Sequence, residues 1–250
     1  MAALFQDPYT LAFCVATFLV AGTIKGVLGI GLPATAIALL TLVMDPTEAI
    51  PVMVLPIIAT NIQQFFFTPH RAETARAYAW IAVALVVSIF VTALFITRMS
   101  QSFLVIAIGV VMCVFAVHAL SGFRIPVGRG PMWQIGVGLT AGVCGGLSAI
   151  WAPPIAMYLL SLNVSRDRFV SGCGFLFLVG SVPLAAGLTA SGVLNSRTMA
   201  LSMVALVVSI IAFRLGAALR SRLANDTFRK AVLIAFLVFG ARLIVTGVTR

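Results

Sequence analysis

The sequence is short of charged residues. They make up 9% of its 250 residues, and only six of them are aspartate or glutamate. A water-soluble domain of this length carries far more charge, because charged residues account for about a quarter of a typical soluble chain. Hydrophobic residues reach 62%, and the mean hydropathy is +1.16. The sequence therefore predicts an integral membrane protein whose main partner is the lipid bilayer.

Residues that bind metals or perform catalysis are also scarce. The four cysteines form no CxxC pair, and both histidines precede Ser148 in the chain. Neither a His-Glu-x-x-His motif nor a Gly-x-Ser-Gly motif is present, which argues against intramembrane metalloproteases and serine proteases. We expect no metal, no cofactor and no enzymatic activity.

Basic residues exceed acidic ones and give a formal net charge of +10. In a soluble protein this balance would indicate nucleic acid as a partner. Here most of the basic residues fall between apolar segments, where they set the orientation of a membrane protein. We therefore expect no nucleic-acid partner.

The apolar pattern repeats after 120 positions. In each half a long apolar segment precedes three more spans, expected at residues 49–67, 78–97 and 103–120 and at residues 169–190, 198–219 and 228–248. Identical pairs at this offset include Gly22/Gly142, Gly26/Gly146, Ile30/Ile150, Pro33/Pro153 and Leu40/Leu160. The sequence predicts one membrane domain made of a first repeat, residues 1–125, and a second repeat, residues 126–250.

The long apolar segment over residues 9–44 cannot be one membrane helix. As a straight helix it would reach about 54 Å, against a hydrocarbon core of roughly 30 Å. Glycines weaken helix continuity, and proline suits the first turn of a new helix. The residues concerned are Gly26, Gly29, Gly31 and Pro33. We expect two helical arms joined by a break within residues 25–32, and a matching break in front of Pro153 and Pro154.

The positions of lysine and arginine distinguish two ways in which these broken segments can meet the bilayer. If each segment crosses once, the basic residues divide almost evenly. If each folds back as a hairpin, one side collects Arg71, Arg76, Arg124, Arg129, Arg166, Arg168, Arg220, Arg222, Arg229 and Lys230, and the other keeps Arg98, Arg197 and Arg250. The uneven division is the usual cytoplasmic bias. The sequence therefore predicts an all-α polytopic membrane protein of two inverted repeats, each a broken, re-entrant helical hairpin plus three transmembrane helices, with both termini outside.

Lys25 is the strongest candidate for a functional residue. A lysine at membrane depth costs about 2.5 to 3.5 kcal/mol on insertion scales and needs a reason to be there. The two helices that begin again at Pro33 and Pro153 would direct free N–H groups at the cavity between the repeats, where an anion is the expected ligand. We favour a role for Lys25 in binding an anion over a structural role in which its side chain snorkels to the headgroups or contacts backbone carbonyls. The predicted substrate-binding residues are Lys25, Gly26, Gly29, Gly31, Pro33, Asn61, Gln64, Ser148, Trp151, Pro153, Pro154 and Tyr158.

Structural roles compete with these assignments. For the glycines, tight helix packing is at least as well supported as contact with substrate. Asn61 and Gln64 suit hydrogen bonds between helices equally well, and Trp151 and Tyr158 suit packing or gating. No acidic residue lies clearly inside a span, so the sequence shows no obvious proton relay. We expect a carrier driven by the substrate gradient, by counter-anion exchange or by protonation of the substrate, with Glu48, near the first hairpin, as a further candidate coupling site.

At these residues the chain resembles the sulfite exporter TauE/SafE family of membrane permeases. The resemblance rests on Gly22-xx-Lys25-Gly26-xx-Gly29-x-Gly31, on Asn61-Ile62-Gln63-Gln64, and on Ser148-xxxx-Pro153-Pro154-xxx-Tyr158 followed by Arg168-Phe169. Leu32, Ala149 and Trp151 depart from the glycine-rich pattern. The resemblance implies a secondary transporter of small sulfur-containing anions, such as sulfite or organosulfonates, with several spans in the bacterial cell inner membrane. A non-catalytic assembly factor or insertase, an anion channel on the same scaffold, and a homodimer stay open.

Overall fold

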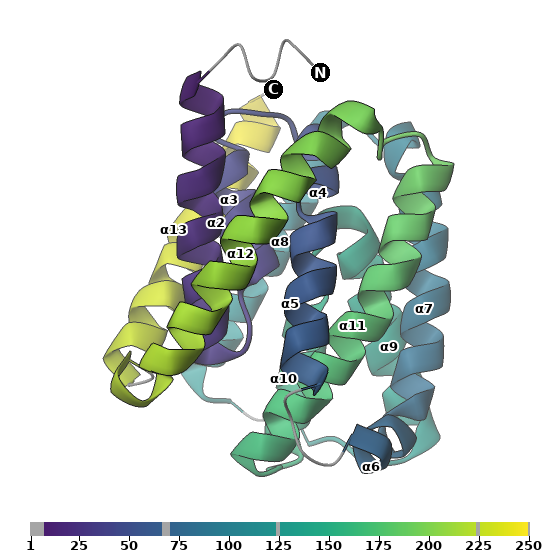
Figure 1. Cartoon of the computed structure of the whole chain (residues 1–250). Coiled ribbons are helices and arrows are strands. Elements are labelled where there is room, and N and C mark those ends of the chain that lie inside the picture. The colour runs from purple at the N-terminus through teal and green to yellow at the C-terminus, as the bar shows by residue number, and fades with distance from the viewer. Residues whose placement is uncertain (1–7, 67–70, 124–125, 224–225, 250) are drawn as a thin grey trace.

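The computed structural model describes residues 8–66, 71–123, 126–223 and 226–249, and every regular element in these ranges is a helix (Figure 1). The first half contains α2 (Pro8–Leu28), α3 (Leu32–Leu40), α4 (Pro46–Val52), α5 (Val54–Phe66), α6 (Arg71–Ala77), α7 (Ala79–Leu94), the short 3-10 helix η1 (Ile96–Arg98) and α8 (Gln101–Ser121). The second half contains α9 (Pro131–Ser148), α10 (Ala152–Ser161), α11 (Arg166–Ala190), α12 (Ser196–Leu223) and α13 (Asp226–Thr249). The predicted all-helical class is confirmed.

Six helical segments in the described ranges are long and apolar enough to cross a membrane. They are α2, the segment Pro46–Phe66 that contains α4 and α5, α8, and the cores of α11, α12 and α13. A seventh appears when α6 and α7, which meet at a bend of 70°, are counted together. The loop expected at Arg71 and Arg76 is instead helix α6, because alanine, arginine and glutamate are good helix formers.

Both broken segments are present, with matching boundaries. α2 ends at Leu28 and α3 begins at Leu32, while α9 ends at Ser148 and α10 begins at Ala152. The first break is shorter than the sequence predicts, since Lys25 belongs to the last turn of α2. Glycine weakens a helix without ending it when the helix can pack closely on a neighbour.

Backbone geometry repeats at the same offset of 120 residues. Gly29 and Ala149, the first residues of the two breaks, have positive φ angles of 80° and 56°. Asp45 and Ser165 occupy the N-cap positions of α4 and α11. Around the two breaks, helix boundaries and turn geometry therefore repeat together with the sequence.

Helices of one half pack on helices of the other. α2 lies along α12, α9 lies along α7, α8 lies along α13, and α5 packs on α11 (Figure 1). A Cβ on Gly22 would come within 2.7 Å of the Ala212 Cβ, and one on Gly146 would come within 3.0 Å of the Ala93 amide nitrogen. The Gly-xxx-Gly spacings therefore serve close helix packing.

The start of α2 and the end of α13 lie together at the top of Figure 1, whereas α6, the start of α11, the end of α12 and the start of α13 lie at the bottom. The basic residues on or next to this lower end are Arg71, Arg76, Arg129, Arg168, Arg220, Arg222, Arg229 and Lys230. Arg124, Arg250 and the repeat boundary at residue 125 lie outside the described residues. The lower end therefore carries strong positive charge.

Candidate functional site

The side chain of Lys25 is buried, with 2% of its surface exposed. Its Nζ donates one hydrogen bond to Thr60 Oγ1, at 2.9 Å, and another to Asn61 Oδ1, and both acceptors lie on α5. Thr60 Oγ1 donates its own proton to Pro56 O at 2.7 Å, which leaves its lone pairs for the lysine. Both acceptors are neutral, so they solvate the ammonium group without cancelling its charge. In the described residues, no carboxylate lies within ion-pair distance of Lys25.

Gln64 lies one helical turn beyond Asn61. Its Nε2 donates to Val170 O of α11 at 3.2 Å, and its buried Oε1 has no donor among the described residues. Gly29 faces this amide, since a Cβ on Gly29 would lie 3.8 Å from Gln64 Nε2. We call this group of residues the α2–α5 cluster, which consists of Lys25, Gly29, Thr60, Asn61 and Gln64.

Gly26 belongs to the contact between α2 and α12. A Cβ at this position would overlap the carbonyl oxygen of Phe213. Arg220 donates from Nε and Nη2 to Gly26 O at 3.0 and 2.8 Å. A carbonyl in the last turn of a helix lacks an intrahelical partner, and the arginine supplies one. Gly26 is thus a packing position next to Lys25.

Gly31 and Pro33 open α3, away from the lysine. Gly31 has a φ of 105° and lines a cavity of about 270 Å³ together with His118, Phe236 and Arg229. Both ring nitrogens of His118 are buried and without partners among the described residues. The first helix restart therefore faces a small, mostly apolar cavity.

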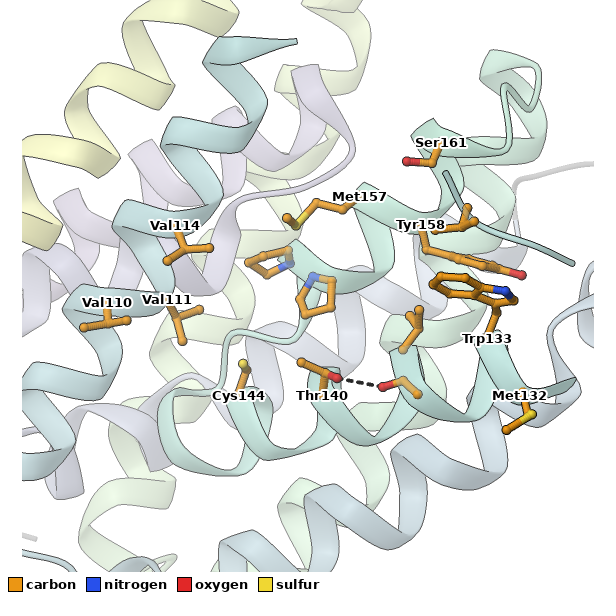
Figure 2. A pocket seen from close by; sticks show the side chains of 15 residues that line it. Val110, Val111, Val114, Met132, Trp133, Thr140, Cys144, Met157, Tyr158 and Ser161 are labelled. Carbon is orange, nitrogen blue, oxygen red and sulfur yellow. Dashed lines mark hydrogen bonds between the residues drawn. The ribbon is translucent and has the colours of Figure 1, made fainter. Parts of the chain in front are cut away.

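Pro153, Pro154 and Tyr158 line a different cavity of about 720 Å³ between α8, α9 and α10 (Figure 2). Figure 2 shows valines of α8 on one side and Trp133 with Tyr158 at the other end. The Tyr158 hydroxyl group donates to Gly128 O at 3.1 Å. None of the described residues that line this cavity is charged, so the described lining lacks the main feature of an anion site.

Ser148 closes the end of α9. Its Oγ donates to Cys144 O at 2.6 Å and accepts from the Ile150 amide at 3.1 Å. Both the donor and one lone pair of the hydroxyl are therefore used within the break.

Trp151 fills the second break. It is 2% exposed, and its ring meets Phe177 of α11 edge-on at a centroid distance of 6.5 Å. The ring packs beside Gly145, the counterpart of Lys25 in the second half. Its Nε1 has no acceptor among the described residues. In the second half, the Trp151 indole therefore occupies the position that is equivalent to that of the Lys25 side chain in the first half.

The predicted site residues thus form separate groups, two of which, the α2–α5 cluster and Trp151, contact different stretches of α11. Gln64 of the cluster donates to Val170 O, while Phe177 and Gly180 contact Trp151. Seven residues of helix lead from Val170 to Phe177, which corresponds to about 10 Å. In this structure the two groups do not line one common cavity.

Three polar residues in or beside the α2–α5 cluster are absent from the predicted site: Thr60, Arg214 and Arg220. Arg214 falls inside the expected span at 198–219, and a charge within an apolar run is the same signal that identifies Lys25. Arg220 is expected in a loop, but α12 continues to Leu223. Thr60 has no signal of its own beyond its position next to Asn61.

Tyr158→Phe is expected to lower the free energy of unfolding by about 1 kcal/mol, because the Gly128 carbonyl loses its donor. Thermal unfolding in detergent micelles measures this change. Tyr78→Phe is the matched control, since no described residue forms a hydrogen bond with the Tyr78 hydroxyl group. An equal effect of both substitutions would show that the Tyr158 hydrogen bond contributes nothing specific.

Comparison with curated proteins and with solved structures finds no match. A family model described as sulfite exporter TauE/SafE matches residues 14–243. This family match indicates a membrane permease, in agreement with a helical, multi-pass chain. Because the match covers almost the whole chain, the protein belongs to the sulfite exporter TauE/SafE family.

Proposed function

We propose that this permease is a secondary transporter of small sulfur-containing anions, such as sulfite or organosulfonates, across the bacterial inner membrane. The observation that carries the proposal is the buried Lys25 ammonium group, which has neutral acceptors and no carboxylate partner among the described residues. A buried charge without a counter-ion is costly, so an anion that enters the site is attracted.

The size of this attraction is sufficient to matter. A unit charge about 4 Å from a monoanion, at an effective dielectric constant near 20, contributes on the order of 4 kcal/mol. That energy offsets part of the dehydration of a small anion. Asn61 and Gln64 add amide groups that can hydrogen-bond oxygen atoms of the substrate.

The pairing of helices supports the inverted-repeat arrangement as part of the proposal. α2 with α12 and α9 with α7 are equivalent pairs under an exchange of the two halves, residues 1–125 and 126–250. A cavity of about 390 Å³, lined by Glu48, Asn195 and Thr198, lies near the start of α4 and α12. Alternating access would expose the α2–α5 cluster first to one end and then to the other.

Binding and transport of sulfite by the purified protein test the proposal. At a concentration 100 times its Kd, a ligand stabilises by about 2.7 kcal/mol, which raises the unfolding midpoint by roughly 5 to 10 °C. We expect this shift for sulfite or a sulfonate with the wild type, and the loss of most of it in Lys25→Met. Lys230→Met is the matched control, because Lys230 is exposed in the first turn of α13.

Flux into proteoliposomes separates a transporter from the alternatives. A carrier gives saturable flux that Lys25→Met abolishes and Lys230→Met preserves. Conductance that never saturates would show a channel, and a complete absence of flux and binding for every sulfur anion would favour an assembly factor. Equal responses of the two lysine variants would overturn the role of Lys25.

A further inference from the structure

A further cavity adjoins the α2–α5 cluster, with which it shares Gln64. Its volume is about 330 Å³, and α5, α11 and α12 supply its walls. The lining residues are Gln63, Gln64, Val170, Phe213, Arg214, Ala217 and Arg220. We call it the α12 arginine cavity. Two guanidinium groups and two amides surround a space of this size, so its chemistry differs from that of the apolar cavity in Figure 2.

Arg214 has no structural partner that accounts for its position. It lies nine residues before the end of α12, about 13 Å along the helix, and inside a span of high hydropathy. Among the described residues no carboxylate forms an ion pair with it. An arginine at membrane depth contacts water or an anionic group. For Arg214, the cavity is where such a contact can form.

Arg220 links the cavity to the lysine. Its two hydrogen bonds to Gly26 O attach the end of α12 to the residue that follows Lys25. Gln64 lines the cavity and also belongs to the α2–α5 cluster. The buried Oε1 atoms of Gln63 and Gln64 have no donor among the described residues, and as acceptors they can bind protons of water or of a guanidinium group. The donors for an oxyanion are therefore the two guanidinium groups.

We propose that the α12 arginine cavity binds an oxyanionic group, either that of a free sulfur oxyanion on its way to Lys25 or the phosphate of an anionic lipid. Guanidinium groups bind such oxygens through paired, charge-assisted hydrogen bonds. The basic residues collected at the lower end raise the local concentration of anions there. This inference rests on the proposed function only for the identity of the free anion.

The test uses Arg214→Gln in a Lys25→Met background, so that binding at the central site does not contribute. Arg222→Gln is the matched control: it removes the same charge from the same end of α12, but Arg222 does not line the cavity. Arg214→Gln should fold normally, because no hydrogen bond or ion pair of Arg214 is found in the described residues. The full-length protein is studied in nanodiscs.

Two arms distinguish the sources of the oxyanion. In zwitterionic lipid, sulfite is added and the thermal unfolding midpoint is followed; if the free anion is bound, Arg214→Gln weakens the apparent affinity about tenfold and Arg222→Gln does not. In the second arm, no sulfite is added and an anionic phospholipid replaces part of the zwitterionic lipid. If the lipid phosphate is bound, the anionic phospholipid raises the unfolding midpoint of the protein that keeps Arg214 and does not raise that of Arg214→Gln. When neither arm separates Arg214→Gln from Arg222→Gln, the proposal is overturned.

Failure of this proposal is distinguishable from failure of the proposed function. The function depends on the difference between wild type and Lys25→Met, both of which retain Arg214. The cavity depends on the difference between the two arginine variants. In the wild-type background we also expect Arg214→Gln to raise the KM for sulfite several-fold while kcat changes little, and Arg214→Lys to restore part of the loss.

Discussion

Replacing Gly26 with alanine is expected to lower the free energy of unfolding by about 2 to 4 kcal/mol. The new Cβ would overlap the Phe213 carbonyl oxygen and lie 2.7 Å from both the Ala217 amide nitrogen and the Gly216 Cα. These are backbone atoms of α12, so no side-chain rotation relieves the overlap, and the helices must separate. Separation also weakens the bonds from Arg220 to Gly26 O. Thermal unfolding in micelles measures the loss.

Gly29→Ala is the matched control, three residues further along. The nearest atoms to a Cβ there are 3.8 Å away, which is ordinary contact. At the positive φ of 80°, alanine destabilises the folded state by about 1 kcal/mol. Alanine also lowers the conformational entropy of the unfolded chain, which offsets part of this loss. Ala149 already adopts this geometry in the second break. A loss for Gly29→Ala as large as that for Gly26→Ala would contradict packing as the role of Gly26.

Periodicity and composition predict the fold well because membrane helices are set by local rules. A span needs length and low polarity, and every backbone group must be satisfied within the helix. The predicted span at 103–120 and the helix at Gln101–Ser121 therefore nearly coincide. The extent of the break was less predictable. Glycine permits a break at Gly26 or Gly29, and only the fit of α2 against α12 decides that the helix continues to Leu28.

The candidate site depends on contacts between distant segments, which the sequence does not specify. Lys25 stands out because charge is rare within a span, but the identity of its acceptors depends on how α5 packs on α2. Thr60 is an ordinary residue in sequence and a direct partner in space. Trp151 is prominent in sequence, yet it contacts α11 about two turns away from the α2–α5 cluster. A residue type that is rare within a span can be recognised from the sequence, whereas its partners depend on how the helices pack.

Asn61→Leu is expected to destabilise the protein by about 2 to 4 kcal/mol. Leucine has a similar volume but accepts no hydrogen bond, so the buried ammonium group of Lys25 keeps only Thr60 as its acceptor. Removing one partner of a buried charge leaves most of its desolvation penalty uncompensated. The double substitution Lys25→Met with Asn61→Leu removes the charge as well and should recover most of the stability. If the double variant is as unstable as Asn61→Leu, the lysine is not the cause.

Asn61→Asp separates support of the lysine from binding of an anion. The side chain keeps its size and an acceptor for Lys25 Nζ, so stability should stay close to that of the wild type. The new carboxylate, however, cancels the positive charge of the site. A unit charge at roughly 5 Å, with an effective dielectric constant near 20, contributes about 3 kcal/mol, which corresponds to at least 100-fold weaker binding of a monoanion.

Sulfite titration and proteoliposome flux, run beside thermal unfolding, measure the effect of Asn61→Asp on binding, transport and stability. A stable variant that no longer binds or transports sulfite would show that the cluster acts through its net charge. The opposite result, a stable variant with unchanged affinity, would mean that Lys25 holds α2 against α5 and that the anion binds elsewhere. The α12 arginine cavity, which keeps both guanidinium groups in this variant, would then be the site to examine first.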